Sequence, residues 1–338
     1  MSLISRLPSK IFSKVFPAAL FVLATICFRA EAQTRYAFTH RQMGTTFNVL
    51  LYATDSVRAS EAAAAAFRRI DTLNAILSDY RDDSELSKLS RTAGSGKWVK
   101  MSPDLWRVLR ISHRAARKSR GAFDLTLGPL VQLWRRARRQ HELPTDDALR
   151  EAKTRTGYRY IRYRPFGKAV RLQTPGMQLD PGGIGKGYAV DEALKVLQQR
   201  GMEAALVDGG GNLALGAPPP GKAGWQVQIG AMAGDTSHAV TVTLHGVGVS
   251  TSGDRYQYVE IDGKRYSHIV DPATGMGLVD QCTVSVIARN GTEADWLSTA
   301  ASVLGPARAL RLVKRVPKAS AYILAPSANG FRRFSSLK

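Results

Sequence analysis

Cysteine is scarce in this chain, with two residues among 338. Cys27 lies in an N-terminal segment that we expect to be removed, which leaves Cys282 alone in the mature chain. A single cysteine cannot form an intrachain disulfide, so the fold has to be held by its hydrophobic core. Hydrophobic residues make up 44% of the sequence, which is enough for one large domain or two modest ones.

Acidic residues are also in short supply, 27 against 48 lysines and arginines, and the formal net charge is +21. Removal of the first 32 residues, four of them basic and one acidic, would leave +18. Such an excess favours phosphate ligands, polyanions or anionic membrane surfaces. The densest basic cluster, Arg135 to Arg139, follows an apolar run, and we interpret it as the solvated end of a helix.

Internal repeats and low-complexity segments are missing, which argues against a solenoid. The apolar run from Val15 to Phe28 is too short to favour a membrane-spanning helix. It follows a basic start and precedes Ala30-Glu31-Ala32, an order typical of a cleaved signal peptide. The alternatives are an uncleaved anchor and a lipid-modified Cys27, but bulky Ile26 just before Cys27 fits a lipoprotein signal poorly. We therefore predict a signal peptide at 1–32, a domain at 33–338 and a periplasmic protein. Export makes nucleic acid an unexpected partner and leaves association with the membrane surface open.

Hydrophobic periodicity predicts an α+β fold with antiparallel or mixed strand pairing rather than a doubly wound sheet. The expected helices are Ser56–Leu77, Glu85–Leu89, Pro103–Ser119, a segment that starts near Thr145, one from the glycine loop to about Gln199, and Glu293–Leu304. The expected strands and hairpins are Tyr36–Tyr52, Tyr158–Leu172, Ala204–Val207, Gln226–Ile229, Ala239–Leu244, Tyr256–Ile261 and Thr283–Ala288.

A glycine-rich loop, Gly182 to Gly187, precedes one of these helices. It fails the Walker pattern, because Gly187 follows Lys186, and it fits the dinucleotide fingerprint poorly. Its backbone N–H groups and the positive helix end would nevertheless suit a pyrophosphate, with a plain tight turn as the alternative. A second glycine-rich segment, Asp208 to Asn212, could be a hairpin turn or a place where a flat ligand approaches the backbone.

Oxygen-bearing residues recur on the last expected helix. Thr292 to Asp295 matches a capping box, in which Asp295 would reach back to the helix start. Thr299 lies four residues after Asp295 and therefore on the same helical face. A carboxylate and a hydroxyl together could instead serve a hard cation such as Mg²⁺. The polar segment Ser267 to Gly275, which contains His268, is either a structural turn or part of a site.

Taken in this order, the segments resemble the FAD:protein FMN transferase family, often called the ApbE family. The matching segments are Met43-Gly44-Thr45, Leu77-Ser78-Asp79-Tyr80, Ser84-Glu85-Leu86, Phe123-Asp124, Gly128-Pro129-Leu130, Gly183 to Asp191, Val207 to Gly210, Ser252-Gly253-Asp254, Tyr266 to Gly275, Ala294-Asp295 and Thr299. The resemblance covers nearly the whole mature chain, and several segments in one order are far more specific than any one of them.

The resemblance implies a T-fold-like α+β enzyme with mixed or antiparallel sheets and packed helices. It would move FMN from its substrate FAD onto a Thr or Ser hydroxyl of another protein and release AMP, with Mg²⁺ as cofactor. Acceptors in the family are electron-transfer subunits that carry a short Asp-x-x-Thr/Ser-Gly-Ala/Ser-Thr/Ser motif.

The resemblance also implies roles for individual residues. Mg²⁺ would bind Asp295, Thr299 and a loop carbonyl, which we assign to Gly183. His268 and Asp271 would lie near the pyrophosphate, and His268 is our first choice of general base, ahead of Asp271. The residues that would line the FAD site are Met43, Tyr80, Lys186, Asp191, Asp208, Gly209 and Gly210.

The chain departs from the family at two points, and neither involves the proposed metal ligands. Pro181 replaces a usual small or apolar residue before the glycine loop. Family members often read Trp-Gly-Phe-Gly where this sequence has Trp134-Arg135-Arg136-Ala137.

Two other functions would use the same expected site. One is a Mg²⁺-dependent FAD pyrophosphatase, in which water attacks, and the other is a periplasmic flavin-binding protein without catalysis.

Overall fold

The computed structural model describes residues 33–231, 237–253, 258–279, 282–328 and 330–337, and the described residues form one compact unit. The predicted signal peptide and cleavage site lie outside the described residues, as does Asp254 of the Ser252-Gly253-Asp254 motif. Among the helices of the described part, none is long and apolar enough to cross a membrane.

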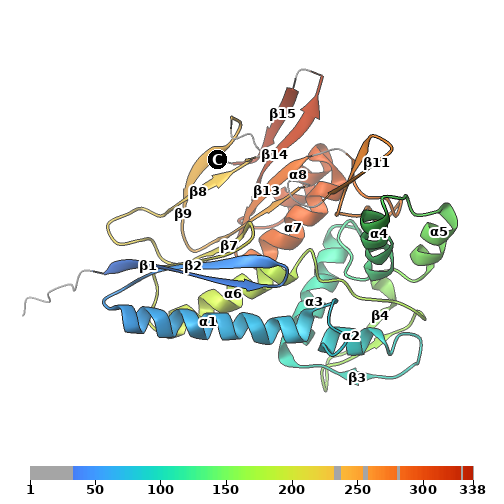
Figure 1. The fold of residues 1–338 in the computed structure, drawn as a ribbon, viewed down its shortest axis with the longest axis horizontal. Coiled ribbons are helices and arrows are strands. Elements are labelled where there is room, and N and C mark those ends of the chain that lie inside the picture. The colour runs from blue at the N-terminus through green and yellow to red at the C-terminus, as the bar shows by residue number, and fades with distance from the viewer. Residues whose placement is uncertain (1–32, 232–236, 254–257, 280–281, 329, 338) are drawn as a thin grey trace, which may run out of the picture. The chain divides into compact units, whose positions relative to one another are not determined.

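The centre of this unit is an eight-stranded sheet in the order β1-β2-β6-β7-β10-β13-β14-β15 (Figure 1). Its neighbouring strands pair antiparallel. The strands are β1 (Thr34–Gln42), β2 (Thr45–Ala53), β6 (Ala205–Gly209), β7 (Asn212–Leu215), β10 (Gly248–Ser252), β13 (Thr283–Ala288), β14 (Ser320–Ser327) and β15 (Gly330–Ser335).

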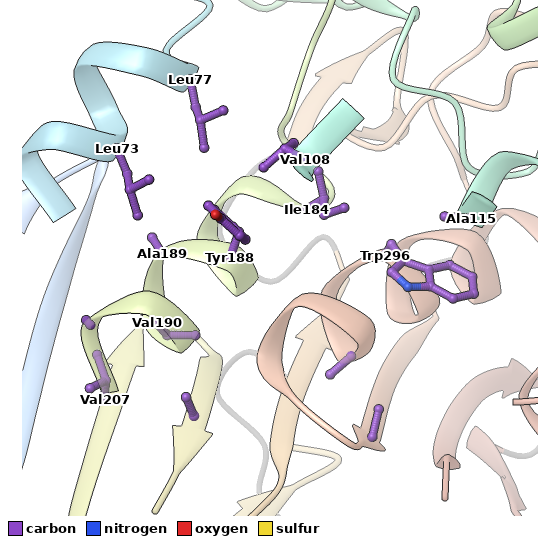
Figure 2. Packing of buried hydrophobic residues seen from close by; sticks show 14 of the residues in the cluster. Leu73, Leu77, Val108, Ala115, Ile184, Tyr188, Ala189, Val190, Val207 and Trp296 are labelled. Atoms are coloured by element: carbon purple, nitrogen blue, oxygen red, sulfur yellow. The ribbon is translucent and has the colours of Figure 1, made fainter. Parts of the chain in front are cut away.

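Helices α1 (Ser56–Leu77), α6 (Gly185–Gln199), α7 (Gly291–Leu304) and α8 (Pro306–Lys314) pack in the main core with this sheet. Figure 2 shows Leu73 of α1, Val190 of α6 and Val207 of β6 within this core. The hairpin of β8 (Trp225–Ile229) and β9 (Val240–Leu244) forms another apolar cluster with residues of the large sheet. These sheet residues alternate along the strands with those that face the main core. A sheet that buries both faces in this way satisfies the α+β prediction.

A smaller core joins α4 (Gly128–Gln140) and α5 (Asp146–Thr154) to the hairpin of β11 (Tyr258–Ile261) and β12 (Lys264–Ser267). The remaining elements are α2 (Glu85–Ser90), α3 (Pro103–Lys118), the 3₁₀ turn Tyr158–Tyr160, and a sheet of β3 (Val99–Lys100), β5 (Ala169–Leu172) and β4 (Ile161–Arg164).

Most predicted elements are confirmed, and local capping explains their sharp starts. Ser84 caps α2 and Thr145 caps α5 through their side chains.

The capping box predicted for Thr292 to Asp295 is wrong. Asn290 is the N-cap of α7 and accepts a hydrogen bond from the N–H of Glu293, so the helix starts two residues earlier than predicted.

Candidate active site

Helices α6 and α7 cross in close contact and exchange hydrogen bonds through two Gly-x-x-x-Asp segments, Gly187 to Asp191 and Gly291 to Asp295. The carboxylate of Asp295 accepts a hydrogen bond from the N–H of Gly187 at 2.8 Å. In return, the carboxylate of Asp191 accepts from the N–H of Gly291 at 2.7 Å. Each helix therefore supplies a carboxylate to the positive N-terminal end of the other, and we call this arrangement the reciprocal clasp.

The two carboxylates of the reciprocal clasp differ in how many of their oxygens are used. Asp191 accepts from the N–H of Gly291, from the N–H of Thr292 at 2.8 Å and from the Thr292 hydroxyl at 2.5 Å. Burial raises its pKa to about 6 in spite of these donors. Because both of its oxygens are occupied, Asp191, which was predicted to line the FAD site, ties α7 to α6.

Asp295 keeps one oxygen open. Its Oδ2 accepts from Gly187, and within the described residues no hydrogen bond reaches Oδ1. Burial raises the pKa of Asp295 to about 6, while nearby Lys186 and the Gly187 N–H lower it in part. A buried carboxylate with an open oxygen is a suitable ligand for a hard cation. Asp295 has no capping role for its own helix, contrary to one of the two sequence interpretations.

Thr299 and Gly183 also lie together. A Cβ placed on Gly183 would be 2.9 Å from the Thr299 hydroxyl oxygen, so the glycine backbone lies directly against that side chain. Asp295, one helical turn earlier, faces the same loop through Gly187. The structure thus places Thr299 and Asp295 of α7 against Gly183 and Gly187 of the glycine loop. In the described part of the chain no group of three His, Cys, Asp or Glu side chains could hold a metal, so any cation here would rely on such mixed oxygen ligands.

The glycine loop presents donors for an anion beside these ligands. The N–H of Gly185 bonds to the Pro181 carbonyl, and the N–H of Gly187 bonds to Asp295. Two other N–H groups of the loop, those of Gly183 and Lys186, have no acceptor among the described residues. The Lys186 side chain lies near enough to Asp180 and Asp295 to lower the pKa of each carboxyl. The loop therefore combines backbone donors, a helix N-terminus and a cation, as a pyrophosphate site requires.

The second glycine-rich segment is the turn between β6 and β7. Asp208 accepts from the Asn48 side chain at 3.2 Å and from the N–H of Gly211 at 2.9 Å. A Cβ on Gly210 would lie 2.3 Å from the hydroxyl oxygen of Thr45, so this turn touches the β1–β2 turn that contains Met43. The structure thus brings Met43, Asp208, Gly209 and Gly210 to one end of the sheet.

A buried network of hydroxyl groups connects this turn to α7. The Ser250 hydroxyl donates to the Asn212 side chain at 2.8 Å and lies 2.9 Å from the Ser298 hydroxyl. Ser298 also contacts the Ser252 hydroxyl at 2.7 Å. Because Ser298 precedes Thr299 and Asn212 follows the β6–β7 turn, the network fixes the two parts of the candidate site relative to each other. None of these serines was among the predicted site residues.

Tyr80 lies in a third group, with Arg135 at its centre. The Arg135 Nη2 atom is 2.5 Å from Asp79 Oδ2 and 3.2 Å from Asp180 Oδ2. The Arg135 guanidinium carbon is 4.0 Å from the centre of the Tyr80 ring. The interpretation of the basic cluster as a solvated helix end is therefore wrong for Arg135. An amphipathic pattern does not show which arginine turns inward, although Asp180, just before the glycine loop, marks where a cation is needed.

Asp271 and His268 lie in the segment that follows β12. Asp271 accepts from the N–H of Ala273 at 2.8 Å and from the Thr274 hydroxyl at 3.3 Å, so its carboxylate closes its own turn. His268 is half-buried next to this turn. The indole of Trp134 donates to the Gly275 carbonyl at 2.8 Å, which joins the turn to α4 and hence to Arg135.

A cavity of about 450 Å³ lies between α3, α6 and α7. Of the predicted site residues only Asp191 lines it, and its walls include Arg107, Arg114, Lys118 and Arg289. It is therefore separate from the place where Lys186 and Asp295 meet.

Comparison with known proteins gives consistent matches over almost the whole chain. A model of the ApbE family matches residues 43–323. The chain is 32% identical over 318 residues to an FAD:protein FMN transferase of Klebsiella pneumoniae, covering 91% of this chain and 89% of the relative. It is 34% identical over 310 residues to one of Treponema pallidum, covering 86% and 84%.

Solved structures match as well. The flavinyl transferase ApbE of Pseudomonas stutzeri, in its apo form, superposes with a TM-score of 0.79 at 30% identity. The superposition covers 90% of this chain and 95% of that one. The sheet and helices described above are therefore an arrangement already known in experimental structures.

Proposed function

Because the chain belongs to the ApbE family, we propose that it is an FAD:protein FMN transferase, which moves FMN from FAD to a hydroxyl group of an acceptor protein and releases AMP. The acceptor in this proposal is an electron-transfer subunit with the Asp-x-x-Thr/Ser-Gly-Ala/Ser-Thr/Ser motif. The observation that carries the proposal is the meeting of Asp295, Thr299, Gly183 and Lys186 at the N-terminus of α6.

The reaction breaks the pyrophosphate bond of FAD and forms a phosphoester with the acceptor hydroxyl. Its main requirement is that the charge on the phosphate oxygens be neutralised. In this chain the N–H groups of Gly183 and Lys186 would bind those oxygens, and the ammonium group of Lys186 would offset their charge.

Mg²⁺ fits the neighbouring ligands, which are the open oxygen of Asp295, the Thr299 hydroxyl and the Gly183 carbonyl. When bound, it would supply further neutralisation of phosphate charge. The Gly187 N–H holds the Asp295 carboxylate in one orientation, so the open oxygen is presented without rearrangement.

The acceptor hydroxyl has to lose its proton as it attacks phosphorus, and the proton needs a base. Both oxygens of Asp271 are occupied within its turn, which favours His268 as that base. Trp134 would hold the His268 segment against α4, and so at a fixed place relative to Tyr80 and the glycine loop.

The decisive experiment incubates the purified mature chain with FAD, Mg²⁺ and an acceptor domain that carries the motif. We expect a fluorescent acceptor band on a denaturing gel under ultraviolet light and a mass increase equal to FMN. An acceptor in which Ala replaces the target Thr is the control. Release of free FMN and AMP at the same rate with either acceptor would indicate the pyrophosphatase, and FAD binding without any turnover would indicate a flavin-binding protein.

We predict that Mg²⁺ and FAD bind cooperatively. The proposed ligand set contains one carboxylate, that of Asp295, and Mg²⁺ with so few protein ligands usually completes its shell with substrate phosphate oxygens. Linkage requires each ligand to tighten the other by the same factor, which we expect to be about tenfold or more. Calorimetric titration of Mg²⁺ with and without FAD measures this factor, and equal affinities would contradict a shared ligand shell.

We also propose that the chain is exported and cleaved after Ala32, so that it acts in the periplasm. The basis is the sequence of the first 32 residues alone. N-terminal sequencing of the protein from a periplasmic extract should begin at or near Gln33. An intact Met1, or a lipid on Cys27, would contradict cleavage at this site.

A further inference from the structure

Arg135 is held by two carboxylates from different segments of the chain. Asp79 follows α1, and Asp180 precedes the glycine loop, where it also accepts the N–H of Gly182 at 2.7 Å. The Asp79, Arg135 and Asp180 side chains are 17%, 21% and 10% exposed. Ion pairs with this degree of burial restrain geometry better than exposed ones, because solvent screens them less.

The guanidinium of Arg135 covers the ring of Tyr80. A planar, delocalised cation can donate hydrogen bonds to carboxylates in its plane and stack on an aromatic face at the same time, which an ammonium group cannot do. Arg135 therefore fixes the orientation of the Tyr80 ring as well as the distance between that ring and the start of the glycine loop.

Tyr80 still has an open side. The residue is 77% exposed although Arg135 lies 4.0 Å from its ring centre. Its backbone N–H bonds to the Ser78 hydroxyl, and its own hydroxyl makes no hydrogen bond with the described residues. An aromatic ring that is held from one face and open on the other provides a stacking surface for a flat ligand.

We propose that Arg135 is a positioning residue that holds the Tyr80 ring so that the isoalloxazine ring of FAD stacks on its open face. This inference rests on the proposed function, in which Tyr80 lines the FAD site. The restraint acts on the flavin end of FAD, whereas the glycine loop acts on the phosphates.

Three ligands distinguish an effect on binding of the flavin end from an effect on binding of the phosphate end. FAD and FMN carry the flavin ring, and ADP carries only the adenine nucleotide. In Arg135→Ala we expect the dissociation constants of FAD and FMN to rise about tenfold and that of ADP to change less than about twofold. The quenching of FMN fluorescence on binding should weaken in parallel. Arg135→Lys should not restore either value, because lysine cannot bridge both carboxylates and lie flat on the ring.

Arg136→Ala is the matched control, since Arg136 is the exposed neighbour with the same charge and no ion pair among the described residues. It should leave all three dissociation constants unchanged. Asp79→Asn tests the same restraint from the other partner, and its effect should not add to that of Arg135→Ala. Additive effects of the two substitutions would contradict a shared role.

Two results would overturn the inference. Tighter FMN binding by Arg135→Ala would mean that the guanidinium covers the face that the flavin needs. An equal loss of ADP and FAD affinity would mean that Arg135 acts through the glycine loop. Both results come from measurements of ligand binding, without an acceptor protein and without turnover. A wild-type chain that binds flavin as expected and transfers none would refute the proposed function and leave the role of Arg135 standing.

Discussion

Replacing Asp295 with asparagine is expected to lower the rate of FMN transfer by at least about a thousandfold, because the carboxylate of the proposed ligand set is lost as a cation ligand. Asparagine has nearly the same shape and can still accept the hydrogen bond from the Gly187 N–H. The reciprocal clasp should therefore persist. The rate is measured as fluorescence of the acceptor band at saturating FAD and Mg²⁺.

The same substitution should stabilise the metal-free chain at pH 7.5. Burial raises the pKa of Asp295 from 3.8 to about 6, so the folded chain binds this proton more tightly than the unfolded chain. The contribution of the Asp295 carboxyl group to the stability of the fold therefore falls as the pH rises from about 4 to about 6, and it stays low above that window. Asparagine carries no charge and avoids this loss, so the melting temperatures should differ at pH 7.5 and converge at pH 4.

Glu293→Gln is the control, because it neutralises a carboxylate on the same helix outside the candidate site. Its rate of FMN transfer should stay within about twofold of the wild type, as for most substitutions away from a site. Full transfer by Asp295→Asn, with or without a change in melting temperature, would exclude Asp295 as a cation ligand.

Replacing Gly187 with alanine is expected to destabilise the fold and to lower transfer about a hundredfold, since small displacements of catalytic groups are costly. The new Cβ would lie 2.4 Å from the Gly291 carbonyl oxygen and 2.6 Å from the Asp295 Cβ, both too close for any real contact. Helices α6 and α7 would have to separate. We expect a loss of about 1–3 kcal/mol in the free energy of unfolding, as in other overpacked sites.

Gly185→Ala distinguishes this clash from helix propensity. Its Cβ would meet Pro181 at 3.5 Å, an ordinary contact, and alanine at the first position of a helix should be favoured over glycine by at most about 1 kcal/mol. Urea unfolding should therefore show Gly185→Ala at least as stable as the wild type and Gly187→Ala less stable. If both variants gained stability, α6 and α7 would not be in the close contact described here.

The sequence predicts the elements of this fold well where the signal is local. The apolar period of α1 and the capping by Ser84 lie within one segment, and both predictions are confirmed. Elements that depend on distant partners were missed. Strand β10 (Gly248–Ser252) has small polar residues, and it is a strand because β7 and β13 pair with it on both sides.

The candidate site shows the same limit. The family resemblance implied that Gly183, Asp295 and Thr299 share a site, and the structure places Thr299 against Gly183 and Asp295 against Gly187 of the same loop. It also gives Asp191 partners on α7, about 100 residues later in the chain, which spacing alone could not reveal, and it gives Asp271 partners within its own turn. The inward turn of Arg135 depends on Asp79 and Asp180, which lie 56 and 45 residues from it, so no local pattern could predict it.

The reciprocal clasp also bears on the order in which the chain can fold. Helix α6 has no side-chain cap from its own loop, and the carboxylate at its start comes from a residue 108 positions later. A 15-residue helix is marginal by itself, and contacts over such separations form slowly. A nascent chain that ends before α7 thus lacks the group that completes the start of α6. Competence to bind the flavin nucleotide should therefore arise late, when α7 docks, so that unfinished chains do not sequester it.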